Sequence, residues 1–100
     1  MIKLEIRVKI IPHKKNEFMQ AVKNICNSES QFDPVTPLAA FQQLDDENIF
    51  NFVGEWKSRH NLENFLNSSA YEMLIGAFHV LGEIQQAHIH DINTTEKIKI

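Results

Sequence analysis

The sequence predicts an α+β sandwich in which helices cover one face of an antiparallel sheet. Three observations support this fold class. Apolar and charged residues alternate near the N-terminus, apolar residues recur at three- and four-residue steps in two later stretches, and a compact polar turn joins two apolar-aromatic runs. A chain of 100 residues fits one domain, which at this size buries only about two-thirds of the surface that it exposes when unfolded. A small homo-oligomer is compatible with that limit.

The composition is that of a soluble globular protein, with 43% hydrophobic and 23% charged residues. A formal charge of −3 without a concentrated basic face argues against binding to nucleic acid. No apolar run approaches the roughly 18 to 20 residues that span a bilayer, and the alternating charges of MIKLEIRVKII exclude a signal-peptide core. We therefore expect a cytoplasmic protein with no membrane partner. The single cysteine, Cys26, cannot form an internal disulfide and is expected to be a buried apolar residue.

The first half of the chain predicts a strand, a helix and a connection. Pro12 suits a first helical turn, and apolar residues at helical spacing predict a helix from about His13 to Asn27. The turn formers and two prolines of SESQFDPVTP predict a connection at Ser28–Pro37. Before them, Ile2–Ile10 is predicted to be a strand, because apolar residues alternate there with Lys3, Glu5, Arg7 and Lys9.

The second half begins with a hairpin and a short helix. DDEN lies between LAAFQQL and NIFNFVGEW, which predicts antiparallel strands near Leu38–Leu44 and Asn48–Trp56. Ser58 can then cap a short helix that carries Leu62, Phe65 and Leu66.

A longer helix and a last strand complete the predicted domain. SAYE places Ser69 and Glu72 at capping-box spacing for this helix, which ends at Gly82. EIQQAHIHDI resumes the alternation of a strand. Residues 1–93 thus form the expected domain, and residues 94–100 form a tail long enough to reach a neighbouring subunit. The apolar face of the helix consists of Tyr71, Leu74, Ile75, Phe78 and Leu81.

The predicted order of strand, helix, two strands, helix pair and strand is the ferredoxin-like βαββαβ plan. The helices cover only one face of this sheet, so the other face would be exposed to solvent in a single copy. The last strand presents His88 and His90 there, while the first strand presents its charged residues. A mixed polar and aromatic face of this kind suits packing against the same face of a second copy.

Two stretches of the chain resemble the antibiotic biosynthesis monooxygenase family, and the similarity extends over about Ile2–Ile92. PHKKNEFMQAV is similar to the family's exit from its first strand into a helix. FVGEWKSRHNLENFLNSSAYEML is similar to a segment in which an aromatic residue and a Lys-Ser step end the third strand, and a Ser-x-x-aromatic step precedes a later helix. The resemblance implies a ferredoxin-like domain that pairs into a dimeric α/β barrel.

The resemblance covers several activities, and the fold alone does not choose among them. The family includes cofactor-free oxygenases of phenols and quinols, heme-degrading enzymes, an isomerase and proteins without a known reaction. The heme-degrading branch resembles a template that has an asparagine in the first strand. The template also has a tryptophan and a histidine in later helices. Here the strand has no asparagine, and Phe65 and Ile75 occupy the other two positions. Heme degradation is therefore not expected.

A cofactor-independent oxygenase of this kind would need an apolar substrate pocket and residues that act in it. Tyr71 would orient a phenolic oxygen by hydrogen bonding, and His79 would be a reserve base. Each residue also has a structural interpretation, in which Tyr71 is a core residue and His79 lies at the surface. His13 and His60 fall at predicted helix starts and have no identified partner. The pocket would be furnished by Phe41, Trp56, Phe65 and Leu74, although Trp56 can equally fill the space between sheet and helices.

His88 and His90 are candidates for metal ligands, because residues two apart on a strand project from the same face. Glu5 or Glu55 would supply a third ligand if their strands lie alongside. A His-x-His pair without a fixed third ligand is a weak indication, and the similar family is mostly free of metal. We therefore expect neither a metal nor a cofactor.

The resulting hypothesis is a homodimeric, cofactor-independent monooxygenase of a small phenol or quinol. The alternative is a non-catalytic dimer of the same fold that binds a small ligand or a partner protein, and the missing polar residues at Phe65 and Ile75 favour it. A cavity of at least roughly 300 Å³ reached by Tyr71 would support the enzyme, and a packed interior would support the binder.

Overall fold

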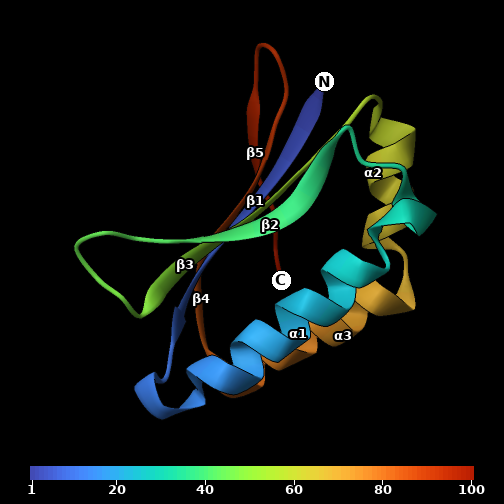
Figure 1. Ribbon diagram of the computed structural model, residues 1–100. Coiled ribbons are helices and arrows are strands. Elements are labelled where there is room, and N and C mark those ends of the chain that lie inside the picture. Colours follow the sequence, from blue (N-terminus) through green and yellow to red (C-terminus); the bar gives the residue numbers. More distant parts are fainter.

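The structure is a computed structural model that describes residues 1–100, with the side chains of all of them except residues 29 and 30. It confirms the predicted α+β class, with the helices on one side of an antiparallel sheet (Figure 1). The elements follow in the order β1 (Ile2–Ile10), η1 (Pro12–Lys14), α1 (Lys15–Asn27), η2 (Glu29–Phe32), β2 (Thr36–Gln42), β3 (Ile49–Trp56), α2 (Arg59–Leu66), α3 (Ser69–Leu81), β4 (Gly82–His90) and β5 (Thr95–Lys97).

The sheet has the strand order β2-β3-β1-β4-β5, and all neighbouring strands are antiparallel. The first strand in sequence therefore lies in the middle, paired with β3 on one side and β4 on the other. Ile6 is opposite Phe52 on β3 and Ala87 on β4. This arrangement extends the ferredoxin-like plan by one edge strand.

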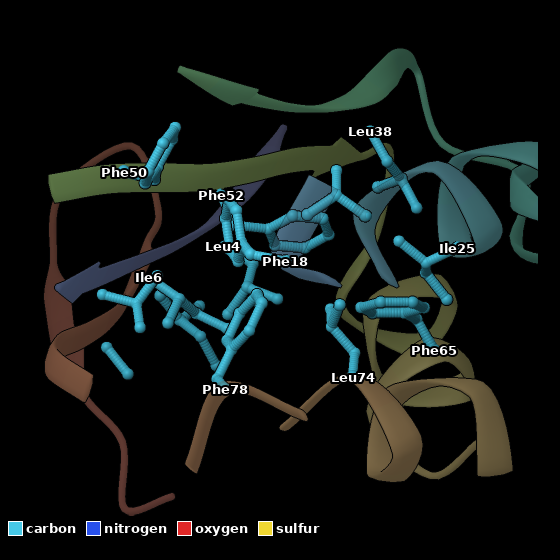
Figure 2. Close-up of a cluster of buried hydrophobic side chains, with 14 of the residues drawn as sticks. Leu4, Ile6, Phe18, Ile25, Leu38, Phe50, Phe52, Phe65, Leu74 and Phe78 are labelled. Atoms are coloured by element: carbon cyan, nitrogen blue, oxygen red, sulfur yellow. The ribbon is translucent and has the colours of Figure 1, made fainter. Parts of the chain in front are cut away.

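The alternation of β1 divides its side chains between two environments. Its apolar residues are buried against the helices, while three of its four charged residues are partly exposed on the opposite side, called the outer face below. Phe50, Phe52 and Trp56 of β3 point to the helices as well. Figure 2 shows this core, in which the ring of Phe18 from α1 lies 4.6 Å from that of Phe50 and 5.6 Å from that of Phe78 of α3.

Helices α1 and α3 run antiparallel and side by side beneath the sheet, and α2 covers one end of it (Figure 1). Gly82 connects α3 directly to β4 and is opposite Ile10 of β1. A Cβ atom at this position would collide with the carbonyl oxygen of Lys9, so only glycine permits the approach of the two backbones. The predicted end of the helix at Gly82 thus has a packing cause.

Two predicted elements have different boundaries in the structure. The first helix begins at Lys15, because Pro12–Lys14 forms a separate 3-10 turn. The second strand covers Thr36–Gln42 and not Leu38–Leu44, since Thr36 already pairs with Glu55 before an irregularity in the register. The predicted connection also contains the 3-10 helix η2.

The capping box predicted at Ser69 was wrong by one residue. Ser68 is the residue that precedes α3, and its hydroxyl oxygen accepts a hydrogen bond from the backbone N–H of Tyr71 at 3.1 Å. The cap predicted at Ser58 was correct, because its hydroxyl oxygen accepts a hydrogen bond from Asn61.

The predicted tail contains a fifth strand. Thr95–Lys97 pairs with His88–His90 of β4, and Ile98 and Ile100 pack against the core. The tail therefore lies along its own sheet. None of the helices that the structure describes combines the length and the apolar character needed to cross a membrane.

Candidate functional site

Four aromatic side chains meet where β3 ends and the helices begin. This aromatic cluster consists of Phe32, Trp56, Phe65 and Tyr71. The ring of Phe65 lies at its centre, stacked on Trp56 at 5.1 Å and in edge contact with Phe32 at 5.1 Å and Tyr71 at 5.3 Å. Trp56 and Phe65 are fully buried, whereas Tyr71 is only partly buried.

Local sequence signals fix the members of this cluster. Trp56 is the last residue of β3, on the side of the sheet that faces the helices. Ser58 then starts α2, which carries Phe65, and Ser68 starts α3, which carries Tyr71 in its first turn. The two serine caps therefore set the positions from which the rings of Phe65 and Tyr71 meet.

Tyr71 is the member of the cluster with a reactive group. Burial raises the pKa of its phenol to about 12, because the neighbouring apolar groups disfavour the charged phenolate. Its hydroxyl forms no hydrogen bond with any residue that the structure describes. At neutral pH the side chain is thus a neutral phenol that can donate one hydrogen bond to a ligand.

The structure does not gather the four residues predicted to furnish a pocket around one space. Trp56 and Phe65 contact each other directly. Phe41 lies on the outer face of β2 and is 59% exposed. Leu74 is buried on the α1 side of α3, and Figure 2 shows it near Phe65 and Ile25. The space beneath the helices is occupied by side chains at this end.

The two predicted catalytic residues are also separated. Tyr71 and His79 are eight residues apart on α3, which corresponds to about 12 Å along the helix axis. Tyr71 contacts the aromatic cluster, while His79 is exposed to solvent. One small substrate cannot touch both side chains within a single chain.

A groove with a cavity volume of about 290 Å³ lies between α1 and α3. The side chains that leave it open are alanines, namely Ala21 of α1 and Ala70 and Ala77 of α3. Asn24 and Met73 also line it, and Leu74 forms part of its wall. Tyr71 does not line the groove, so this cavity is separate from the aromatic cluster.

The outer face of the sheet carries the histidine pair. His90 is bonded on both ring nitrogens, to Glu5 at 3.2 Å and to Thr95 at 3.1 Å. Its ring lies 5.7 Å from that of His88. Across the part of the chain whose side chains are described, no group of three or more His, Cys, Asp or Glu residues is arranged to hold a metal ion.

Two contacts between elements were not predicted from the sequence. Phe32 lies in a stretch interpreted as a connection, yet its carbonyl oxygen accepts a hydrogen bond from the indole nitrogen of Trp56 at 2.9 Å. A single aromatic residue within a polar turn-rich stretch was the only indication of this role. Arg59 forms an ion pair with Glu96 at 2.6 Å, which joins α2 to β5 and raises the pKa of the guanidinium.

Comparisons with known proteins support the fold. No protein-family model and no curated protein matches the chain. Among solved structures, a candidate antibiotic biosynthesis monooxygenase from Nitrosomonas europaea matches with a TM-score of 0.79 and 14% identity, over 94% of this chain and 100% of that one. A conserved protein from Methanosarcina mazei Go1 matches with a TM-score of 0.76 and 18% identity, over 89% and 87%.

A variant of SnoaB, a cofactor-independent oxygenase from Streptomyces nogalater, matches with a TM-score of 0.75 and 10% identity over 93% of each chain. Likeness at these identities establishes architecture and leaves the chemistry open. The chain therefore has the ferredoxin-like fold found in solved antibiotic biosynthesis monooxygenases.

Proposed function

We propose that this protein is a cofactor-independent monooxygenase of a small phenol or quinol. The proposal rests on the environment of Tyr71. This partly buried residue lies at the edge of an apolar aromatic cluster, and its hydroxyl has no hydrogen-bond partner among the described residues. The likeness to SnoaB adds support, because that protein is described as a cofactor-independent oxygenase.

The proposed reaction uses the substrate as its own reductant. The ionised phenol transfers one electron to dioxygen. The resulting substrate radical and superoxide then combine at an activated CH₂ carbon of the substrate. One oxygen atom remains on that carbon as a carbonyl group. The other oxygen atom leaves as water together with the two hydrogens of the CH₂ carbon. Four electrons pass from carbon to dioxygen, so no external reductant is needed.

Tyr71 has a defined role in this scheme. Because burial keeps its own phenol protonated up to a pKa of about 12, the residue donates a hydrogen bond and does not act as a base. A donor at this position stabilises the ionised oxygen of the substrate, and hydrogen bonds to charged groups contribute about 1.5–3 kcal/mol. Phe65 contacts the Tyr71 ring and is itself stacked on Trp56, and the burial of Phe65 and Trp56 keeps them away from substrate.

The proposal includes a homodimer paired through the outer faces of two sheets. Arg7 is one of the partly exposed charged residues that this pairing would cover. It lies in the middle of the outer face, opposite Asn51 on β3 and Gln86 on β4. The exposed ring of Phe41 supports this pairing, because a second copy would cover it.

Oxygen uptake with a panel of phenols and quinols tests the activity. We expect uptake above the autoxidation rate of at least one substrate, and a loss of about tenfold or more in Tyr71→Phe, the size of one hydrogen bond to a charged group. His79→Ala tests the other candidate and should cost less, because His79 lies two helical turns away. Asn64→Ala, at an exposed position of α2, is the control. Equal turnover in wild type and Tyr71→Phe would refute the role of Tyr71.

The second candidate is a non-catalytic dimer that binds a small ligand or a partner. The direct stacking of Trp56 on Phe65 favours it, because these rings leave no open space between them. A thermal-shift screen with small aromatic compounds separates the two functions. A ligand that raises the melting temperature without any oxygen uptake would favour the binder.

A further inference from the structure

The outer side of α3 carries two large apolar side chains that face solvent in the single chain, beside the polar residues Ser69, Glu72 and His79. Met73 is 76% exposed and Val80 is 69% exposed. The helix contains one acidic residue, Glu72, and one histidine, His79, and it has no lysine or arginine among its 13 residues. Large apolar side chains that are grouped on an exposed helix face mark a contact surface. We propose that the outer side of α3 binds the same surface of a second copy of this chain.

Gly76 in the middle of α3 supports a close contact with another helix. A Cβ atom at this position would meet no heavy atom within 4 Å, and no glycine of the chain has a positive φ. The packing of the single chain therefore gives no reason for glycine, which weakens a helix relative to alanine. A missing side chain does permit another backbone to come close. Gly76 thus marks the point where the two helices approach.

The polar groups of α3 make this surface complementary to itself, because the imidazole of His79 can donate a hydrogen bond to the carboxylate of Glu72. Glu72 and His79 are seven residues apart, so they lie on the same side of the helix two turns from each other. In an antiparallel pair centred beside Gly76, each Glu72 lies opposite the partner's His79. A parallel pair would instead place the two Glu72 carboxylates together, which is unfavourable. The arrangement of charges therefore selects an antiparallel contact with two-fold symmetry.

The groove between α1 and α3 supplies a hole beside these projecting side chains. Its volume is about 290 Å³, and alanines at positions 21, 70 and 77 keep it open. In the antiparallel pair, the partner's Val80 comes to the turn that contains Glu72 and Met73, next to this groove. Its branched side chain can enter the hole, as a side chain of one helix packs into the surface of another.

The size of the surface sets the strength of the association. A helix of 13 residues is about 20 Å long, which is short for the roughly 800 Å² per partner of a stable interface. The contact is therefore weak between isolated chains. It becomes stronger when the copies are also joined through another surface, since the second contact is then intramolecular. The contact does not depend on the proposed oxygenase activity.

Sedimentation equilibrium of the full chain at concentrations from about 10 to 500 µM tests the contact. Gly76→Arg blocks the approach of the helices, and its side chain points into open space, so the fold should persist. Asn64→Arg adds the same charge at an exposed position of α2 and serves as the control. We expect the wild type and Asn64→Arg to reach twice the mass of Gly76→Arg. Equal masses for all three proteins, as monomers or as dimers, would overturn the proposal.

A charge exchange gives a second test that does not depend on position 76. His79→Glu places a carboxylate opposite the Glu72 of the partner and should weaken the association at least about tenfold. Adding Glu72→Lys to it restores opposite charges and should recover the wild-type mass. The proposal is wrong if the single variant associates as well as the wild type, or if the double variant stays as weak as the single one.

Discussion

The indole nitrogen of Trp56 donates a hydrogen bond to the carbonyl oxygen of Phe32 over 2.9 Å. This bond connects the end of β3 to η2, the segment that leads into β2. The rings of both residues also contact Phe65 of α2. One side chain thus joins the sheet, the connection and a helix, and it does so with a polar group inside an apolar cluster.

Replacement of this side chain by Trp56→Phe should lower the free energy of unfolding by about 2–4 kcal/mol. The smaller ring leaves a cavity, and the carbonyl oxygen of Phe32 loses its partner. Urea denaturation followed by circular dichroism measures the change. Asn64→Ala at an exposed position of α2 is the control, and it should change stability by less than about 0.5 kcal/mol. A loss of less than about 1 kcal/mol in Trp56→Phe would show that the indole contributes little.

The two neighbouring serines before α3 should differ in their effect on stability. Ser68→Ala removes the hydroxyl that accepts the hydrogen bond from Tyr71, which costs about 1 kcal/mol for a helix cap. Ser69→Ala lies within the first turn of the helix and should cost almost nothing. Urea denaturation of both variants measures the difference. Equal losses would contradict Ser68 as the only cap, and a larger loss in Ser69→Ala would assign the cap to Ser69.

The same pair of serines shows how far the sequence determined local structure. Both serines fit the pattern of a cap, and only the position of a hydroxyl relative to the N–H of Tyr71 decides between them. The periodicity of β1 was reliable, because a central strand buried on one side requires a regular alternation. The fifth strand was missed because its three residues are all exposed and its pairing depends on the neighbouring β4.

The candidate site was harder to predict than the fold. Spacing along a helix predicts which side chains share a face, but it does not predict whether their rings leave a space. Phe65 and Trp56 were expected to border a pocket, and the structure places them in direct contact. Phe32 joins them from a stretch without periodicity, where pattern analysis has no information. The role of Tyr71 in binding a substrate stays a prediction.

Two glycines should respond in opposite directions to the same substitution. A Cβ atom at Gly54 would lie 2.5 Å from Cδ2 of Leu38 and 2.8 Å from the Trp56 ring, so Gly54→Ala should destabilise the fold by about 1–3 kcal/mol. Gly76→Ala meets nothing within 4 Å and should stabilise α3 by up to about 1 kcal/mol. Thermal unfolding of dilute protein measures both. Destabilisation by Gly76→Ala would show that a conformational requirement acts at that position.

Tyr71 is the single tyrosine of the chain, so its ionisation can be followed by absorbance near 295 nm without overlap from another phenol. We expect a midpoint at about pH 12 in the folded protein, because burial raises the pKa, and a midpoint near the ordinary value of about 10 in concentrated urea. A folded midpoint near 10 would place the hydroxyl in bulk water. Tyr71→Phe should show no transition, which confirms the assignment.

The raised pKa of Tyr71 also predicts how stability depends on pH. Below pH 10 the phenol is protonated in both states, and its contribution to stability is constant. Between about pH 10 and 12 the unfolded chain releases the proton while the folded chain retains it, so the free energy of unfolding falls, and it levels off above pH 12. Lysines titrate in the same range, so the measurement is the difference between wild type and Tyr71→Phe in urea denaturation from pH 8 to 12. A difference that stays constant over this range would contradict the burial of the phenol in the folded state.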